Sequence, residues 1–275
     1  MTTRGEFMTA AALAAIAPAV PSFPAPMKKP PMLERGDRVG LIAPASPPTG
    51  DDIGQAAEHV ASLGLVPVLG KYVRAQNGYL AGSDAERAAD FNAMARDSTI
   101  RAIVAIRGGY GTMRILPMLD YEAVARDPKI VMGFSDLTAL LNAVAVRSGV
   151  VTFHGPLGAH GSSWSGAARA YLEAALFATN PARLRIDGAR PIVPGRARGR
   201  LAGGNLALVA SLVGTPFAVA AGDAILFLEE TEEPPYRIDR MLTQLALAGD
   251  LAAARGILVG RCTKCVGPGP TQSAD

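Results

Sequence analysis

The chain has 275 residues, of which 49% are hydrophobic and 19% charged, and its formal net charge is +3 at pH 7. This length allows one large folded domain or two, and the spread of the 30 glycines and 21 prolines excludes a low-complexity tract. The densest basic run, residues 195–200, has no aromatic residue between its arginines, so we expect an ordinary basic surface and no nucleic-acid partner.

The N-terminus has the pattern of an export signal. A charged start at Arg4 is followed by a short, weakly apolar run from Met8 to Ala17. The start also resembles a twin-arginine signal in which Gly5 replaces the second arginine. No segment reaches 18 uncharged apolar residues, so we expect no transmembrane helix. We assign residues 1–32 to a signal-like segment and a flexible Pro-rich linker, and expect a periplasmic location, with the cytoplasm as the alternative.

From about Leu33, short apolar runs alternate with segments of helical spacing. The strands are expected at 38–43, 65–69, 100–106 and 129–133, and the helices at 51–63, 83–96, about 111–119 and 136–147. Ser83 and Glu86 fit a capping box at the start of the second helix. Because the strands are apolar throughout, they predict a parallel sheet covered on both faces. Residues 33–165 are therefore predicted to form a doubly wound α/β domain.

The pattern changes after residue 165. We expect a helix over 166–177 inside a linker region at 166–198, because several prolines follow it. A second, smaller α/β domain is predicted over 199–275. Its strands are expected at 223–229 and 254–260. One helix is expected after the segment 200–206 and ends at Val213, and another covers 237–247. The chain stops soon after the last strand, so we expect this domain to be incomplete and the chain to be C-terminally truncated.

Cys262 and Cys265 form a lone C-x-x-C pair near the end of the chain. A zinc site would need a second pair of ligands, and a thioredoxin-like motif would open a helix near the first strand. We therefore expect two ordinary cysteines and no metal site.

Ser135 is the first candidate for chemistry. It lies between a predicted strand and a predicted helix, where a sharp turn can hold a nucleophile above a sheet. The next backbone N–H, at Asp136, lies at a helix N-terminus and could stabilise an oxyanion. The full G-x-S-x-G motif is absent, because Leu137 stands in place of the second glycine. The motif alone leaves open that Ser135 and Asp136 only cap the helix.

Two further segments follow predicted strands. The glycine-rich segment 107–111 lies at the carboxyl edge of the sheet, where open α/β sheets bind ligands, and its glycines allow a backbone N–H to approach a substrate oxygen. A plain tight turn or a phosphate loop is the alternative. Glu229 ends another strand, where it could orient a histidine or belong to a solvated acidic loop.

Several segments together resemble the LD-carboxypeptidases, a family of serine peptidases that includes the microcin-C immunity peptidase. They occur in the family's order and cover about residues 33 to 270. The matching segments are 36–46, 107–111, 133–138, 153–156, 203–205 and 228–240.

The resemblance implies a flavodoxin-like N-terminal domain, a smaller C-terminal α/β domain, and a Ser–Glu–His triad without metal or cofactor. Ser135 matches the nucleophile and Glu229 the acid. The backbone N–H groups of Gly109 and Asp136 match the oxyanion hole. The implied substrate is a murein tetrapeptide, cleaved between meso-diaminopimelate and the terminal D-Ala, in murein recycling or remodelling. The implied assembly is a homodimer.

The general base is unassigned, because the family histidine lies in a Gly-His segment that would follow residue 275. His59 is expected on a helix surface and His160 in a Gly-rich loop, and the family does not use the residue that His154 matches. Without a base, a serine is a weak nucleophile near neutral pH. We therefore expect this chain to have little or no activity.

Two alternatives stay open. An immunity-type peptidase would cleave an aminoacyl-nucleotide analogue and would need an aromatic residue to stack on the adenine. Trp164, the only tryptophan, is compatible with that role but fits better as cover for apolar surface. A non-catalytic relative would use the same cleft only for binding. The arginine that would bind the substrate's free carboxylate is not identified by the sequence.

Overall fold

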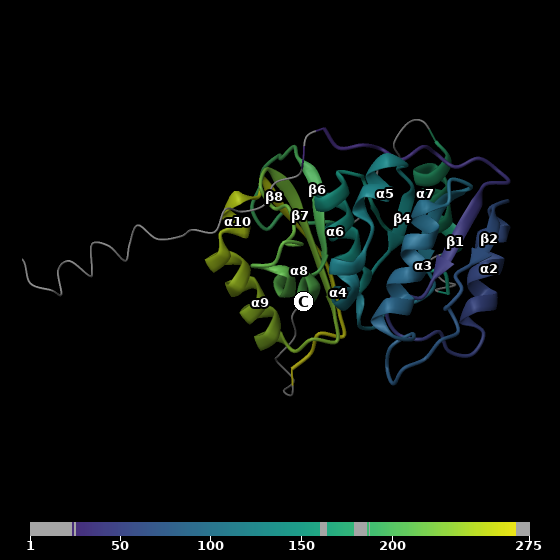
Figure 1. Cartoon of the computed structure of the whole chain (residues 1–275). Coiled ribbons are helices and arrows are strands. Elements are labelled where there is room, and N and C mark those ends of the chain that lie inside the picture. The colour runs from purple at the N-terminus through teal and green to yellow at the C-terminus, as the bar shows by residue number, and fades with distance from the viewer. Residues whose placement is uncertain (1–23, 25, 160–163, 179–185, 187, 268–275) are drawn as a thin grey trace, which may run out of the picture.

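The computed structural model describes residues 24, 26–159, 164–178, 186 and 188–267, and it shows two α/β domains side by side (Figure 1). The elements in chain order are β1 (Arg38–Ile42), α2 (Asp52–Ser62), β2 (Val66–Leu69), α3 (Asp84–Arg96), β3 (Ile100–Ala105), α4 (Thr112–Ile115), the 3₁₀ helix η1 (Leu116–Met118), α5 (Tyr121–Arg126), β4 (Ile130–Gly133), α6 (Leu137–Ser148), β5 (Phe153–His154), α7 (Gly166–Phe177), β6 (Arg200–Asn205), α8 (Leu206–Leu212), β7 (Ala224–Thr231), α9 (Pro235–Ala248), α10 (Asp250–Ala253) and β8 (Gly256–Thr263).

The first domain is built on a parallel sheet of five strands in the order β2-β1-β3-β4-β5. This is the flavodoxin-like order, and it confirms the predicted fold. Both faces of the sheet are covered, since Ile103 and Val104, neighbours on β3, belong to two separate apolar clusters. The strand order reverses between β1 and β3, so the loops that follow these strands border a crevice at the carboxyl edge.

Helix α7 belongs to the first domain. Leu172 and Leu176 on this helix pack in the same buried cluster as Trp164, and the backbone N–H of Leu33 donates to the carbonyl of Leu176 at 2.9 Å. The predicted linker region at 166–198 is therefore wrong over its first part, because the helix buries an apolar stripe against the sheet.

The described part of the predicted N-terminal linker is held along the first domain, at the top of Figure 1. Lys28 forms a parallel bridge with Val150, and its backbone N–H donates to the carbonyl of Gly149 at 2.7 Å. Its Nζ donates to the carbonyl of Ala125 at 2.7 Å. This part is not the free linker that its prolines predicted. The signal-like residues 1–23 lie outside the described residues.

The second domain has a parallel sheet in the order β6-β7-β8, which confirms the predicted smaller α/β domain. Leu226 and Leu228 of β7 are buried in one cluster with Leu206 of α8 and Leu245 of α9, so both helices pack on the same face. Within the described residues, no helix is long and apolar enough to cross a membrane.

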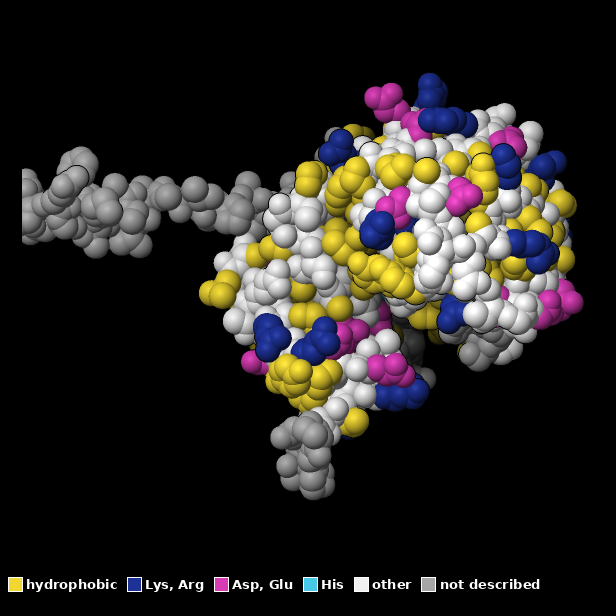
Figure 2. All heavy atoms as spheres, turned by 60° about the horizontal axis from the view of Figure 1, so that its bottom comes forward, with side chains coloured by type: hydrophobic (Ala, Val, Ile, Leu, Met, Phe, Trp, Pro, Cys, Tyr) yellow, Lys and Arg dark blue, Asp and Glu magenta, His cyan; other side chains and the backbone are white. Residues whose placement is uncertain are grey.

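Figure 2 shows the two domains as a larger and a smaller lobe with a hollow between them. On this face the basic and acidic side chains are interspersed, and the visible patches contain both signs of charge.

Side chains of α6 join the two domains through the edge of β6. The Asn142 amide donates to the carbonyl of Gly203 at 2.9 Å and accepts from its N–H at 3.4 Å. One turn earlier, Thr138 Oγ1 accepts from the backbone N–H of Asn205 at 3.0 Å. An edge strand needs partners for its backbone groups, and α6 supplies them here.

We expect the substitution Thr138→Val to lower the free energy of unfolding by about 1–3 kcal/mol, because it keeps the side-chain shape but leaves a buried backbone N–H without an acceptor. Urea unfolding measures the change. The same substitution at the exposed Thr263 is the control and should cost no more than about 0.5 kcal/mol. Equal costs at both positions would contradict this account of the domain junction.

Candidate active site

Ser135 lies in a strained turn between β4 and α6. Its φ is 62°, in the left-handed region that costs a non-glycine residue roughly 1–2 kcal/mol. Gly133 makes the turn possible, since a Cβ at that position would lie 2.8 Å from Leu137 Cγ. The sharp strand-to-helix turn predicted from the sequence is present.

The structure brings Ser135 against the glycine-rich loop that follows β3. A Cβ on Gly108 would lie 3.4 Å from Ser135 Oγ. The next glycine, Gly109, has a φ of 112° and leaves room for Ser46, whose Oγ accepts from the N–H of Tyr110 at 3.2 Å. The loops after β1, β3 and β4 thus meet at one edge of the sheet. The oxyanion role of Gly109 stays a prediction.

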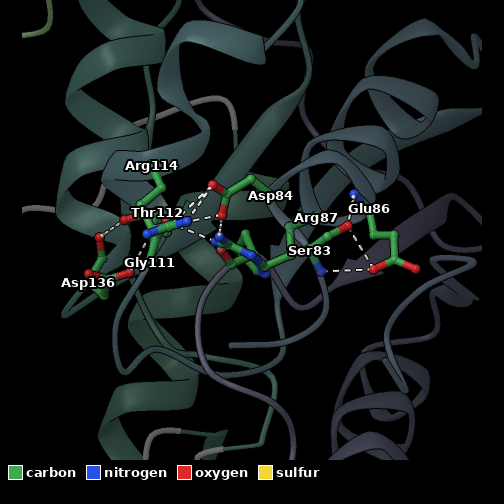
Figure 3. Close-up of polar contacts among 9 residues, drawn as sticks. Ser83, Asp84, Glu86, Arg87, Gly111, Thr112, Arg114 and Asp136 are labelled. Atoms are coloured by element: carbon green, nitrogen blue, oxygen red, sulfur yellow. Dashed lines mark hydrogen bonds and ion pairs between the residues drawn. The ribbon is translucent and has the colours of Figure 1, made fainter. Parts of the chain in front are cut away.

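Asp136 does not cap α6 with its side chain. The residue is only 3% exposed, and its Oδ2 accepts from the backbone N–H of Thr112 at 2.8 Å (Figure 3). Its carbonyl accepts from Thr112 Oγ1 at 2.5 Å. Burial raises the pKa of the Asp136 carboxyl, while hydrogen bonds from Thr112 and from the backbone of Gly111 act in the opposite direction. The carboxylate therefore links two loops, and the helix-cap alternative is wrong for this side chain.

Arg87 of α3 lies behind the glycine-rich loop and is 1% exposed. Its Nη1 donates to the carbonyl of Pro44 at 2.6 Å and to that of Gly111 at 2.8 Å, and its Nη2 pairs with Asp84 (Figure 3). Asp84 also binds Arg114 at 2.8 Å, and these partners lower the pKa of its carboxyl, Arg114 most strongly. The capping box of Ser83 and Glu86, predicted from the sequence, starts the same helix.

Glu229 and Glu230 are neighbours with different environments. Glu230 is buried, and its carboxylate accepts from Asn205 Nδ2 at 2.7 Å and from the backbone N–H of Ala207 at 2.8 Å, so it fixes the start of α8. Glu229 has a buried Oε1 without a hydrogen-bond partner. Burial and then the charge of Glu230 raise its pKa to about 7, against the effect of a hydrogen bond from Asn205. An unpartnered buried carboxylate oxygen is available to a hydrogen-bond donor, as the acid of a triad requires.

The face of β7 that carries Glu229 is turned toward the first domain. Phe227 lies two residues before it, on the same face, and its ring contacts that of His154 at 5.5 Å between centroids. His154 also lies 6.2 Å from the Phe134 ring. Part of His154 stays exposed at a cavity of about 560 Å³ between α6, β5 and β6, but burial of its ring lowers its pKa to about 4.

His59 and Trp164 have structural roles. Trp164 is 4% exposed and donates its indole N–H to the carbonyl of Leu157 at 2.8 Å. His59, predicted on the helix surface, is instead half-buried. It stacks on Trp164 at 5.3 Å, and its Nδ1 lies 2.7 Å from the carbonyl oxygen of Gly158. His160 lies outside the described residues.

Sequence reasoning missed Arg87 and Thr112. The helical spacing places Arg87 beside Ala88 and Phe91, so a charged residue on a buried stripe was the available signal. Nothing local marks Thr112, whose partners come from a distant loop. In the described part of the chain, Cys262 and Cys265 form no disulfide, and no cluster of three or more His, Cys, Asp and Glu residues could hold a metal ion.

Two family models match this chain. One describes the LD-carboxypeptidase N-terminal domain and matches residues 39–155, and the other describes the LD-carboxypeptidase C-terminal domain and matches residues 198–275. The chain belongs to the LD-carboxypeptidase family.

Individual relatives agree with this assignment. A probable murein peptide carboxypeptidase of Bacillus subtilis is 41% identical over 246 residues, which cover 86% of this chain and 76% of the relative. The murein tetrapeptide carboxypeptidase of Pseudomonas aeruginosa is 35% identical, with coverages of 83% and 77%. A crystal structure of an MccF-like protein from Bacillus anthracis superposes with a TM-score of 0.78 at 25% identity, covering 86% of this chain and 81% of that protein.

Glu229→Gln should stabilise the folded protein at pH 8. The pKa of Glu229 is about 7 in the folded protein, above the ordinary 4.5. The free energy of unfolding therefore falls as the pH rises from 4.5 to 7, because the folded state holds the Glu229 proton more tightly than the unfolded state does. Glutamine removes that cost, which is about 1–2 kcal/mol after solvent screening of the half-buried group. At pH 4 the two proteins should be equally stable.

Glu230→Gln is the matched control for this experiment. It should lower stability at pH 8 by about 1–3 kcal/mol, because an amide cannot accept from all the N–H donors around Glu230. Denaturant unfolding of both variants at the two pH values measures these changes. A Glu229→Gln variant that is less stable than the unsubstituted protein at pH 8 would contradict the buried, unpartnered carboxylate.

Proposed function

We propose that this protein is a serine carboxypeptidase that hydrolyses the L,D bond between meso-diaminopimelate and the terminal D-Ala of murein tetrapeptides. The observation that carries the proposal is Ser135, held in a left-handed turn and packed against the glycine-rich loop at the carboxyl edge of the sheet. The murein peptide carboxypeptidases among its relatives support the substrate class.

The proposed mechanism is acyl transfer. Ser135 Oγ attacks the diaminopimelate carbonyl carbon, and the C=O π electrons move to the oxygen, where the N–H groups of Gly109 and Asp136 stabilise the charge. The C–N bond then breaks, D-Ala leaves as the protonated amine, and water hydrolyses the acyl-enzyme. A histidine would take the proton of Ser135 and pass it to the leaving amine, and would then take a proton from the attacking water and return it to Ser135. Glu229 would orient this histidine.

The base is the part of this mechanism that the chain leaves unassigned. The chain covers 76% and 77% of the lengths of the two murein peptide carboxypeptidases. The unpartnered Oε1 of Glu229 supports a triad in which a histidine hydrogen-bonds to that oxygen.

A second candidate is an immunity-type peptidase that acts on aminoacyl-nucleotide analogues. Similarity to the MccF-like protein favours it. The burial of Trp164 weakens it, because a residue that is 4% exposed and packed among leucines cannot stack on an adenine.

Location and assembly are further proposals. The signal-like start supports export to the periplasm and a role in murein recycling or remodelling there, and the family resemblance supports a homodimer. Fractionation of a tagged protein tests the first: a solely cytoplasmic pool that retains residues 1–25 would contradict export. Light scattering of the purified protein tests the second.

Release of D-Ala from a murein tetrapeptide tests the activity. We expect Ser135→Ala to reduce the rate by about 10³-fold or more, since it removes the nucleophile. Ser62→Ala, on α2, is the control and should leave the rate unchanged. A Ser135→Ala variant as active as its parent would contradict a serine mechanism.

Release of D-Ala also tests where the general base lies. We expect the 275-residue chain to release D-Ala far more slowly than a version continued at its C-terminus through a Gly-His segment. Comparable rates would contradict the assignment of the base to such a segment.

A further inference from the structure

A chain of buried polar contacts ties together the three loops at the carboxyl edge of the first sheet. Arg87 binds the carbonyls of Pro44, after β1, and Gly111, after β3. Thr112, the next residue, donates its N–H and its hydroxyl to Asp136, after β4 (Figure 3). Residues 111 and 112 thus connect the β3 loop to α3 and to the turn after β4, and Ser46 joins the same loop to the segment after β1 through Tyr110.

These contacts are costly for the fold. Arg87 is a charged side chain with 1% of its surface exposed, and its Nε is buried without a hydrogen-bond partner. Asp136 is a carboxylate 3% exposed. Buried charges contribute less stability than apolar residues of the same volume, so stability alone does not explain them.

The location of the contacts offers an explanation. The two predicted oxyanion donors belong to different loops, Gly109 to the loop after β3 and Asp136 to the turn after β4. Their separation therefore depends on what joins these loops. The Asp136 side chain is attached to one donor residue, and its carboxylate binds Thr112, three residues from the other donor.

We propose that Arg87 and Asp136 are positioning residues whose side chains hold the glycine-rich loop at the spacing from Ser135 that an oxyanion hole requires. This inference rests on the proposed function. Arg87 holds the loop from behind through Gly111, and Asp136 holds it from the nucleophile's side through Thr112. Arg114 is the outer, half-exposed partner of Asp84. It contacts Gly111 only through its backbone N–H, which donates to the Gly111 carbonyl at 3.2 Å and does not depend on the side chain.

The first experiment measures whether the contacts hold the loop. Backbone amide exchange of residues 107–112 should become about tenfold faster in Asp136→Ala and in Arg87→Met, because the loop opens more readily. Arg114→Gln is the matched control, since it removes an arginine from the same network but leaves the loop contacts in place. Equal exchange in all four proteins would overturn the proposal.

The second experiment separates positioning from general stability. Both measurements use the version continued at its C-terminus through a Gly-His segment, so that a missing base does not limit Ser135. The tripeptide L-Ala-γ-D-Glu-meso-diaminopimelate is prepared with its reacting carboxyl as an aldehyde or as an alcohol. Ser135 Oγ forms a bond to the aldehyde carbon, the C=O π bond breaks, and the serine proton ends on the former carbonyl oxygen, which lies in the oxyanion hole as the hemiacetal hydroxyl. The alcohol cannot form this adduct. We expect Asp136→Ala to weaken aldehyde binding by about 10- to 100-fold and to leave alcohol binding unchanged.

Asp136→Asn keeps the size and shape of the side chain and retains one acceptor oxygen. Its affinity for the aldehyde should therefore lie between those of the unsubstituted protein and Asp136→Ala. A parallel loss of both ligands in Asp136→Ala would show a merely structural role and overturn the inference. An unsubstituted protein that binds the alcohol but gains nothing from the aldehyde would overturn the inference and keep the substrate class. Binding of neither ligand would contradict the proposed substrate class and the inference together.

Discussion

The hydrogen bonds between α6 and the edge of β6 determine how the two domains meet. Thr138 and Asn142 satisfy backbone groups of β6 that would otherwise be buried without partners. The helix that supplies them begins directly after Ser135, and the strand that receives them pairs with β7 in a register that places Asn205 beside Glu229. The predicted nucleophile and the predicted acid are therefore connected through one helix and two adjacent strands.

Two carboxylates in this region show how different surroundings suit different tasks. Burial raises the pKa of both Asp136 and Glu229. Asp136 is bound by backbone N–H groups and cannot rotate toward a ligand without breaking them. Glu229 keeps an oxygen without a partner, beside an ionisable neighbour whose own oxygens are occupied. The fold thus uses one carboxylate as a fixed support and leaves the other open to a donor.

The periodicity of the sequence predicted much of the fold. The first four strands and the capping box of α3 lie where the apolar runs and the Ser83–Glu86 pair placed them. The expected helix at about 111–119 is divided into α4 and η1 by Pro117, and the short elements α5 and β5 were missed because so few residues carry no clear period.

The site was predictable only in part. Ser135 follows a strand and Glu229 lies near the end of one, so their positions made them candidates, and the family resemblance assigned their roles. Arg87 and Thr112 act through residues from other loops, and such pairs exist only after the strands are assembled. The place of His59 also depended on tertiary contacts, since the ring that covers it comes from Trp164, more than 100 residues later.

The left-handed backbone at position 135 has a consequence for how this family can diverge. Glycine adopts that conformation without steric cost, whereas serine does not. A lineage that no longer needed the hydroxyl would gain stability by any replacement that relaxes the turn, so drift would remove the serine quickly. If Ser135 is the nucleophile proposed above, its strained backbone is a cost that is retained only where the hydroxyl is needed.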